Sequence, residues 1–346
     1  MTSSDPVEIA VVGAGIIGAR IARELLTPAP DPFRAPTAVE IVTSRDERAR
    51  TLRASFGSAA RVVTSLDDTD PVSGDAVGVV VIAKAAGEQL AIARESLLRG
   101  RHVVATSDDL DEVEALLDLD SLARSTDSTL VVGAAMAPGF SCLLAAHAAE
   151  LFDRVDEIHT GRAGAAGPGC ARQRLKALRG TAVDWRDGDW VKRPGFSGRE
   201  LLWFPDPIGA RDCYRAALAD PLLLVPAIDG VERVTARIAA NRRDRALAPF
   251  PVLWPPPVEG GLGAIRVELR GELKGRRQTV VYGALDRPAV AGAATAAVAA
   301  LWLSSGSASP GATGLAGLGA TLPLLSELSR RGIRAAAFDG AIETPA

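Results

Sequence analysis

The sequence predicts an α/β protein, with an N-terminal doubly wound parallel sheet followed by a second α+β domain built on an antiparallel sheet. Three observations favour this architecture. Continuous apolar runs alternate with helical segments over roughly the first 138 residues, which is typical of strands buried on both faces. A glycine-rich turn follows the first apolar run. Beyond residue 138 the strands alternate polar with apolar residues, as in a sheet with one solvated face.

The first domain, residues 1–138, is predicted to alternate strands with helices. Apolar runs predict strands at 7–12, 38–42, 61–63, 76–83, 101–105 and 129–133. Amphipathic or capped segments predict helices at 17–26, 47–56, 87–99 and 111–124. Asp108, Asp109 and Asp111 suit the N-cap and first turn of the last helix, because carboxylates stabilise a helix N-terminus.

The second domain, residues 139–346, carries hairpin signals. The Asp187-Gly188 pair suits a two-residue turn between strands, and this turn places Trp185 opposite Trp190. Two residues that face each other across an antiparallel pair share one face of the sheet. We therefore expect a tryptophan pair in this hairpin.

The rest of the second domain combines another hairpin with helices. The stretches 264–273 and 279–284 alternate in polarity on either side of a Lys-Gly turn. Arg211 and Tyr214 fall on a predicted helix, where a spacing of three residues puts them on one face. The sequence leaves open whether the last segment, 288–346, returns to the first domain.

Three glycines at G-x-G-x-x-G spacing directly follow the first predicted strand and precede the first helix. Gly13 would make the tight turn, Gly15 would let the backbone approach a pyrophosphate, and Gly18 would let the helix pack closely on the strand. The helix begins near Ile16 and Ile17, where free N–H groups and the positive end of the helix dipole attract an anion. This context predicts a dinucleotide-binding Rossmann unit.

The end of the second predicted strand indicates which dinucleotide binds. An NAD site usually has an acid at this place for the ribose hydroxyls, but the sequence has Ser44 and Arg45 there. Glu40 lies several residues too early, inside the strand. A serine hydroxyl and a guanidinium suit a 2′-phosphate, so we predict NADP over NAD. The alternative is that Arg45 is an ordinary surface residue.

Composition excludes several classes of function. The formal net charge of −3 comes without a basic stripe, which argues against nucleic acid as a partner. The three cysteines are widely spaced, and no His/Cys/carboxylate group has metal-ligand spacing, so we expect neither a disulfide framework nor a metal site. The apolar run 289–303 is short for a membrane span. With no signal peptide at the N-terminus, we expect a cytoplasmic protein and no membrane partner.

Three stretches resemble the saccharopine dehydrogenase-like reductases. They are the glycine turn with Ser44-Arg45, the segment HVVATSDD at 102–109, and the segment GAAMAPGFS at 133–141. Weaker similarity is found at 204–209 and 328–333. The resemblance implies a nucleotide-dependent enzyme that acts on amino-acid imines and related carbon–nitrogen bonds. It also implies a homodimer.

A neighbouring family with the same architecture, the glucose-fructose and inositol dehydrogenase-like group, carries Glu-Lys-Pro after its fifth strand. This chain has Thr106-Ser107-Asp108 there, so the lysine of that group is absent. The difference makes sugar dehydrogenation the less favoured activity.

Residues at the carboxyl ends of the predicted strands are candidates for the cofactor side of the site. Ala83 and Thr106 end two neighbouring strands and would line the cofactor. Lys84 follows Ala83, where it could contact the cofactor ribose or, with a pKa lowered by burial, protonate a substrate nitrogen. The alternative for Lys84 is a solvated loop lysine.

Candidate substrate residues cluster in the second domain around a glycine-rich loop at 159–176. His159 could donate a proton and Arg162 could hold a carboxylate. His159 could equally be paired inside the sheet. Cys170 has no His/Asn arrangement beside it that would make it a nucleophile. The aromatic residues Trp185, Trp190, Trp203 and Phe204 are candidates for a wall over the nicotinamide, or for the core or a dimer interface.

These observations together predict an NADP-dependent oxidoreductase. It would transfer hydride to or from a small imine, amine or amino-acid-like substrate. Two alternatives stay open: a nonenzymatic NADP-binding redox sensor, because no acid/base residue is unambiguous, and a sugar or alcohol dehydrogenase.

Overall fold

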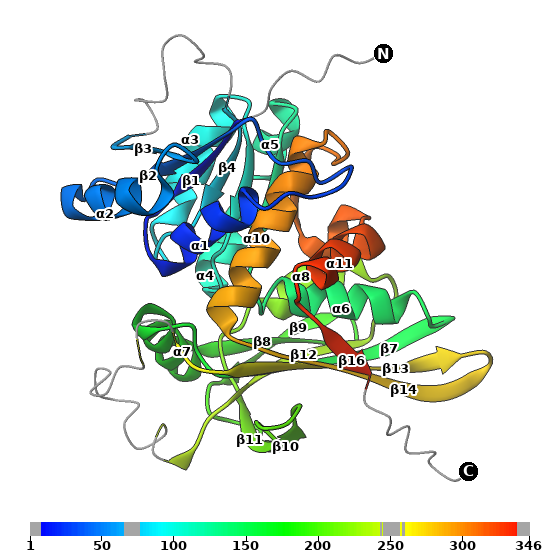
Figure 1. The fold of residues 1–346 in the computed structure, drawn as a ribbon. Helices are drawn as coiled ribbons and strands as arrows, with labels where there is room; N and C mark the ends of the chain where they lie inside the picture. Colours follow the sequence, from blue (N-terminus) through cyan, green and yellow to red (C-terminus); the bar gives the residue numbers. More distant parts are fainter. Residues whose placement is uncertain (1–7, 66–76, 243, 245–256, 258–259, 338–346) are drawn as a thin grey trace. The chain divides into compact units, whose positions relative to one another are not determined.

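The computed structural model describes residues 8–65, 77–242, 244, 257 and 260–337 (Figure 1). The chain divides into two compact units. The first consists of Met1–Ser107, Glu112–Ala135 and Gly292–Thr313, and the second of Asp108–Asp111, Met136–Ala291 and Gly314–Ala346. The last segment of the sequence is therefore shared, because 292–313 groups with the first unit and 314–346 with the second.

The first unit is built on a seven-stranded sheet with the order β15-β6-β5-β4-β1-β2-β3. The strands are β1 (Glu8–Val12), β2 (Ala38–Val42), β3 (Arg61–Val63), β4 (Val77–Ile82), β5 (His102–Ala105), β6 (Thr129–Val132) and β15 (Gly311–Gly314). All pairings among β1 to β6 are parallel. Successive residues of β1 point to opposite faces, and Ile9, Ala10 and Val11 are all fully buried. The doubly wound parallel sheet is confirmed.

Helices cover both faces of this sheet, as the burial of successive strand residues requires. They are α1 (Ile16–Leu25), α2 (Asp46–Phe56), α3 (Gln89–Leu98), α4 (Leu110–Leu117) and α5 (Asp120–Ser125). Helix α10 (Pro288–Ser304) passes from the second unit into the first at Gly292. Its alanine-rich sequence is buried all round, which explains why it is apolar on every side. No helix among the described residues is long and apolar enough to cross a membrane.

The second unit is built on a nine-stranded sheet with the order β10-β11-β12-β7-β13-β14-β16, and β8 joins it through β12 and pairs with β9. The strands are β7 (Arg154–Ala163), β8 (Thr181–Arg186), β9 (Asp189–Pro194), β10 (Glu200–Trp203), β11 (Ala210–Arg215), β12 (Arg233–Ala239), β13 (Gly263–Leu273), β14 (Arg276–Asp286) and β16 (Ala335–Ala337). The pairs are antiparallel except for β7 with β12, which is parallel. The sheet is thus mixed, because β7 and β12 pair across a long crossover connection.

The helices of the second unit complete its α+β architecture. They are α6 (Phe140–Ala149), α7 (Pro168–Arg179), α8 (Asp220–Leu224), α11 (Thr321–Arg330) and the short 3-10 turns η1 (Val225–Ala227) and η2 (Leu315–Leu318). Figure 1 shows α6, α7, α8 and α11 on one side of the long strands β13 and β14, and the edge strands β10 and β11 of the same sheet on the other side.

The hairpin of β8 and β9 has the predicted register. Trp185 pairs with Trp190, and their ring centroids lie 4.9 Å apart in an edge-to-face arrangement. Asp187 and Gly188 have φ values of 52° and 89°, which a tight two-residue turn of this type requires. This prediction is confirmed.

The helix predicted to carry Arg211 and Tyr214 is wrong, because these residues lie on strand β11. Its ladder partners are β10 and β12, and these tertiary contacts override the local helical spacing. Residues three apart in a strand point to opposite faces. Tyr214 is accordingly buried in a cluster with Ala177 and Ile238, whereas Arg211 is exposed.

The two faces of the sheet in the second unit carry different side chains and are covered by different elements. Face 1 carries Ile158, Thr160 and Arg162 of β7, and on it Tyr282 of β14 stacks against His147 of α6, with ring centroids 5.8 Å apart. Face 2 carries Glu157, His159 and Gly161. A Cβ atom placed at Gly161 would lie 2.7 Å from Leu202 of β10. Face 1 is therefore covered by helix α6, and face 2 by β10 near Gly161.

Candidate functional site

Two of the three glycines after β1 are required by close backbone packing. Gly13 has φ of +116°, and a Cβ there would lie 2.3 Å from the carbonyl oxygen of Ala83, at the end of β4. A Cβ at Gly18 would lie 1.7 Å from the carbonyl oxygen of Gly13. Any larger residue at either position would force the backbone apart. The turn therefore packs on the strand ends only because these positions are glycines.

Gly15 differs from the other two glycines, because no atom lies within 4 Å of a Cβ placed there. Its φ of −68° is accessible to any residue, and it is the N-cap of α1. The first turn of α1, at Ile16 and Ile17, contains no acidic residue. Unpaired N–H groups of a first helical turn attract phosphate, and the open space at Gly15 leaves room for the ligand. The glycine turn thus fits a dinucleotide pyrophosphate.

Ser44 and Arg45 lie in the connection from β2 to α2, and both are exposed. The backbone N–H of Arg45 donates to the Thr43 hydroxyl at 3.3 Å. Among the residues that the structure describes, the Arg45 guanidinium has no hydrogen-bond or ion-pair partner. The side chain of Arg48, by contrast, donates from Nε to the carbonyl oxygen of Ala14 at 2.6 Å and so holds the glycine turn. Of these two arginines, Arg45 is the one available to a ligand.

Glu40, the carboxylate of β2, is buried and forms an ion pair with Arg61 of β3. Because it lies inside the strand rather than at its carboxyl end, it is not placed to accept from ribose hydroxyls. This position agrees with the expectation from the sequence that Glu40 is not the acid that binds the ribose hydroxyls of NAD.

A buried glutamine ties the ends of β4 and β5 together. Gln89, in the first turn of α3, donates from Nε2 to the carbonyl oxygen of Lys84 at 2.8 Å and accepts at Oε1 from the N–H of Thr106 at 3.0 Å. Its own backbone N–H donates to Glu112 at 2.8 Å, and the other oxygen of Glu112 accepts from Ser107 Oγ at 2.6 Å. This network fixes the strand ends predicted to line the cofactor. Sequence reasoning missed Gln89 and Glu112, because their partners are 5 to 23 residues away.

Ala83, Lys84 and Thr106 lie where the sequence predicted them, directly beyond β4 and β5. The N–H of Ala83 donates to Val12 at 2.8 Å, and the Thr106 hydroxyl donates to Ile82 at 2.9 Å. The side chain of Lys84 is 35% exposed and its Nζ lies 3.3 Å from Glu88 Oε2. The structure thus gives Lys84 a partially exposed ion pair on the loop beyond β4.

Arg162 is the centre of a polar cluster on face 1 of the second unit. Its guanidinium lies 3.0 Å from Asp108 Oδ2 and donates to the carbonyl oxygen of Ala137. The Arg162 side chain is 13% exposed. Asp108 follows strand β5 closely in the chain and Ala137 follows β6. The arginine is therefore held by two short segments of the second unit that are distant from it in the sequence.

A buried carboxylate lies in the same cluster. Asp220, at the start of α8, accepts from Ser141 Oγ at 3.0 Å and from Thr160. Burial raises the pKa of the Asp220 carboxyl, although the positive charge of Arg162 opposes the rise. No local signal in the sequence marks this carboxylate, because Ser141 and Asp220 are 79 residues apart.

His159 lies on face 2, away from Arg162. Its Nδ1 is 2.9 Å from Thr235 Oγ1 and its Nε2 is 2.8 Å from Glu157 Oε2. Burial lowers the pKa of His159, with Glu157 opposing that shift. The structure does not bring His159 and Arg162 together, because residues three apart in β7 point to opposite faces of the sheet. His159 is thus paired inside the sheet, which was the alternative to its role as a proton donor.

Asp109, directly before α4, binds helix α7. Its carboxylate forms an ion pair with Lys176 and accepts from Gln173 Nε2 at 2.7 Å. Asp108, as described, binds Arg162. Two of the three acids expected at a helix N-terminus are thus used for tertiary contacts within the second unit.

Two of the cysteines and the four candidate aromatic residues are accounted for by burial, pairing or exposure. Burial raises the pKa of Cys170 to about 11 and also raises that of Cys142, which disfavours the reactive thiolates. Trp185 and Trp190 pair with each other, Trp203 is exposed on β10, and Phe204 is buried in the face 2 core. Within the described parts of the chain, no group of His, Cys, Asp or Glu residues could hold a metal ion.

Comparisons with known proteins agree with this geometry. Residues 7–134 match the Gfo/Idh/MocA family, described as an oxidoreductase family with an NAD-binding Rossmann fold. Apo saccharopine dehydrogenase (L-Glu forming) from Saccharomyces cerevisiae is similar in structure, with a TM-score of 0.68 and 14% identity over 96% of this chain and 100% of that chain. Comparison with curated protein sequences gives no match.

Two further solved structures share the fold. Amine dehydrogenase from Mycobacterium smegmatis has a TM-score of 0.50 and 13% identity over 91% of this chain and 96% of that chain. The C. glutamicum DAP dehydrogenase in complex with DAP has a TM-score of 0.50 and 16% identity over 95% of this chain and 99% of that chain. Residues 7–134 thus match the model of an oxidoreductase family with an NAD-binding Rossmann fold, and the chain as a whole shares the fold of saccharopine dehydrogenase.

Proposed function

We propose that this oxidoreductase uses NADP and acts on the carbon–nitrogen bond of a small imine, amine or amino-acid-like substrate. The observation that carries the choice of cofactor is the exposed Arg45 guanidinium, which has no partner among the described residues, beside the exposed hydroxyl of Ser44. Both follow the strand end at which dinucleotide-binding folds distinguish the adenosine ribose from its 2′-phosphate.

Two nearby charged side chains, Arg48 and Glu40, support this assignment because they are already engaged. Arg48 holds the Ala14 carbonyl, and Glu40 is paired with Arg61. One charge-assisted hydrogen bond contributes about 1.5–3 kcal/mol, which corresponds to a roughly ten- to hundredfold preference for the phosphorylated dinucleotide.

The residues of the chain have separate tasks in this proposal. When bound, the dinucleotide supplies or accepts a hydride. The open N-terminus of α1 at Gly15 binds the pyrophosphate, and Ser44 and Arg45 bind the 2′-phosphate. Gln89 positions the Lys84 carbonyl and the Thr106 amide at the strand ends. Lys84 orients the cofactor ribose from the loop beyond β4.

The substrate class is supported by Arg162 and by the named activities of the structural relatives. Saccharopine dehydrogenase, amine dehydrogenase and DAP dehydrogenase are named for amine or amino-acid substrates. A guanidinium has five N–H donors, of which Asp108 and Ala137 engage only some in Arg162. A planar carboxylate suits the remaining donors. We assign Arg162, without His159, to hold the substrate carboxylate.

The proposal is tested by titration and turnover with the unmodified protein. We expect NADPH to bind at least tenfold more tightly than NADH, and NADPH to be consumed with one member of a panel of 2-oxo acids combined with ammonia or amines. Tighter binding of NADH would overturn the cofactor assignment. Binding of NADPH without turnover of any carbonyl, amine or sugar substrate would instead identify a redox sensor. Light scattering in the same preparation tests the proposed homodimer.

Substitutions separate the roles of Lys84 and Arg162. Lys84→Ala is expected to weaken NADPH binding, whereas Arg162→Lys is expected to raise the KM for the substrate with little effect on NADPH binding. The lysine keeps the charge next to Asp108 but loses the planar fork. Unchanged cofactor affinity and turnover in Lys84→Ala would remove Lys84 from the site.

A further inference from the structure

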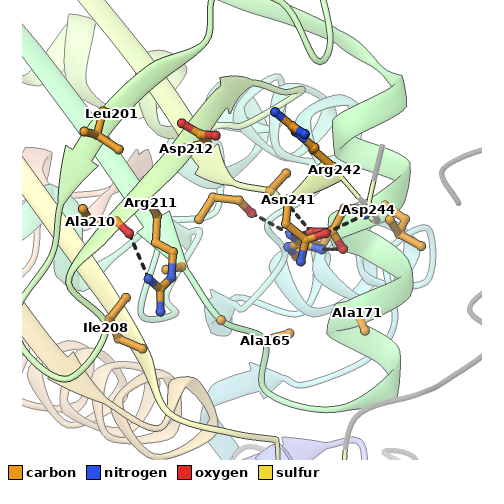
Figure 2. Close-up of a pocket in the computed structure, with 16 residues that line it drawn as sticks. Ala165, Ala171, Leu201, Ile208, Ala210, Arg211, Asp212, Asn241, Arg242 and Asp244 are labelled. Atoms are coloured by element: carbon orange, nitrogen blue, oxygen red, sulfur yellow. Dashed lines mark hydrogen bonds and ion pairs between the residues drawn. The ribbon is translucent and has the colours of Figure 1, made fainter. Parts of the chain in front are cut away.

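A pocket of about 780 Å³ lies in the second unit at the ends of strands β7 and β12 (Figure 2). Its walls come from the loop after β7, from α7, from the β10–β11 hairpin and from the segment that follows β12. None of the lining residues belongs to the Arg162 cluster or to the glycine turn. It is therefore a separate candidate site.

Small side chains make the pocket hollow. Ala163, Ala165, Ala171 and Ala239 line it and contribute only methyl groups. Gly164 also lines it, but its φ of +90° and the distance of 2.7 Å from a Cβ there to Gly263 Cα show that backbone packing requires this glycine. The space is thus produced by alanines drawn from β7, β12, α7 and their connections.

The two acids of the pocket are already neutralised. Asp244 accepts from Arg174 at 3.2 and 2.9 Å, and Arg174 also donates to the carbonyl oxygen of Ala239 at 2.6 Å. Asp212 forms an ion pair with Arg199 at 2.9 Å. One arginine and both carboxylates of the lining are therefore satisfied without a ligand.

Two arginines of the lining are not satisfied in this way. Arg211 donates from Nη1 to the carbonyl oxygen of its own neighbour, Ala210, at 2.9 Å, and has no carboxylate partner among the described residues. Arg242 has no hydrogen-bond or ion-pair partner among those residues. Figure 2 shows the two side chains on different sides of the pocket, with Arg211 near Ile208 and Arg242 near Asn241. Within the described part of the chain, the pocket therefore presents two separate guanidinium groups without a carboxylate partner.

Apolar side chains complete the lining. Leu175, Leu201 and Ile208 line the same space, and Leu201 is 57% exposed. A guanidinium binds a carboxylate with two parallel hydrogen bonds, and apolar walls favour a hydrocarbon chain. We propose that this pocket binds a small aliphatic dicarboxylate, with one carboxylate on Arg211, the other on Arg242 and the carbon chain against Ile208 and Leu201. This is a ligand site in addition to the proposed dinucleotide and substrate sites.

The proposal is tested by calorimetric titration of the full chain with succinate, glutarate and adipate. Inorganic phosphate and the neutral diamide of glutaric acid serve as comparison ligands. We expect saturable binding of at least one dicarboxylate and much weaker binding of the diamide, because the diamide lacks both charges. The preferred chain length will report the separation of the two guanidinium groups.

Substitutions assign the binding to the pocket. Arg211→Ala and Arg242→Ala are each expected to weaken dicarboxylate binding about tenfold or more, the effect of losing a charge-assisted hydrogen bond. Arg276→Ala removes the same charge from the exposed start of β14, outside the pocket, and should leave binding unchanged. NADPH binding is expected to be unaltered in all three variants, and melting temperatures check that each one folds.

Four results would overturn the dicarboxylate assignment. Absence of saturable binding for all three dicarboxylates would remove the site altogether. Equal binding of the diamide would show that charge is not recognised. Phosphate binding as tight as that of the best dicarboxylate would show that the two arginines do not engage separate carboxylates. An equal effect of all three arginine substitutions would place the ligand outside the pocket. None of these results depends on which dinucleotide the protein uses.

Discussion

Substitution of each glycine in the turn after β1 by alanine, which adds one methyl group, distinguishes the roles of the three positions. Ordinary van der Waals contact begins near 3.4 Å, but a Cβ at Gly18 would lie 1.7 Å from the Gly13 carbonyl oxygen, and a Cβ at Gly13 would lie 2.3 Å from the Ala83 carbonyl oxygen. At Gly15 no atom lies within 4 Å. Replacement by alanine should therefore damage the fold at Gly13 and Gly18, and only the ligand site at Gly15.

The expected magnitudes follow from these distances. In Gly18→Ala the obstructing atom belongs to the backbone, so the helix and the turn must separate, at a cost of about 3 kcal/mol or more of unfolding free energy. For a domain of this size that corresponds to a fall in Tm of roughly 6–12 °C. Gly13→Ala adds the strain of a positive φ, on the order of 1–2 kcal/mol. Gly15→Ala should change the unfolding free energy by less than about 1 kcal/mol, because alanine restricts the unfolded chain but is a poorer N-cap than glycine.

The assay combines thermal denaturation without ligand and fluorescence titration with NADPH. We expect Gly15→Ala to keep its Tm and to bind NADPH at least tenfold more weakly, because the methyl group enters the space left for the pyrophosphate. Gly169→Ala is the control, because Gly169 also lies at the start of a helix and no atom lies within 4 Å of a Cβ placed there. A Gly15→Ala variant that binds NADPH normally, or that is as unstable as Gly18→Ala, would refute this interpretation of the turn.

Three further predictions concern the same unit. Arg45→Ala should weaken NADPH binding by about 1.5–3 kcal/mol and leave NADH binding unchanged. The control is Arg50→Ala, which removes an exposed arginine of α2. Equal losses for both dinucleotides would argue against a 2′-phosphate contact. Gln89→Leu removes the hydrogen-bond partners of the Lys84 carbonyl and the Thr106 amide at the strand ends. It should lower the unfolding free energy, measured by urea denaturation, by about 2–4 kcal/mol, and raise the KM for NADPH, measured from initial rates. A normal KM would show that Gln89 does not position the cofactor side. Burial lowers the pKa of His102 from its ordinary 6.5, and Nδ1 accepts from the N–H of Thr129 at 3.0 Å, so the stability contributed by the neutral ring is present above pH 6.5 and is lost as pH falls below it. Urea denaturation across this range should show less pH dependence in His102→Asn, whose side-chain oxygen can still accept from Thr129; an identical slope would assign the pH effect to other groups.

Local sequence signals were sufficient for the parallel sheet and the glycine turn. The glycines, the preceding apolar run and the following helix are all adjacent in the chain, so spacing alone carried the prediction. The same holds for the Trp185–Trp190 hairpin, because a two-residue turn fixes its register. Ser44 and Arg45 could be named as cofactor candidates because their distance from the glycines is set by one strand–helix–strand unit.

Tertiary structure decided which of the candidate residues meet. The face of the sheet on which a side chain lies follows from the alternation of side chains along the strand. What covers that face, however, depends on elements far away in the sequence. Arg162 therefore joins Asp108 and Asp220 on face 1, whereas His159 joins Thr235 on face 2. The β11 strand, which local spacing suggested was a helix, is fixed by its ladder partners.

The sequence by itself determined that this protein has the turn of a dinucleotide-binding fold, because the phosphate-binding turn is built from contiguous residues. Only the tertiary structure decided the rest of the site. Gln89 and Glu112 became visible as supports for the strand ends, and Arg211 and Arg242 as two charges of one pocket, because each pair is brought together by folding over separations that no short motif spans. Hydrogen bonds and ion pairs depend on distances of about 3 Å, and the linear order of residues does not specify those distances.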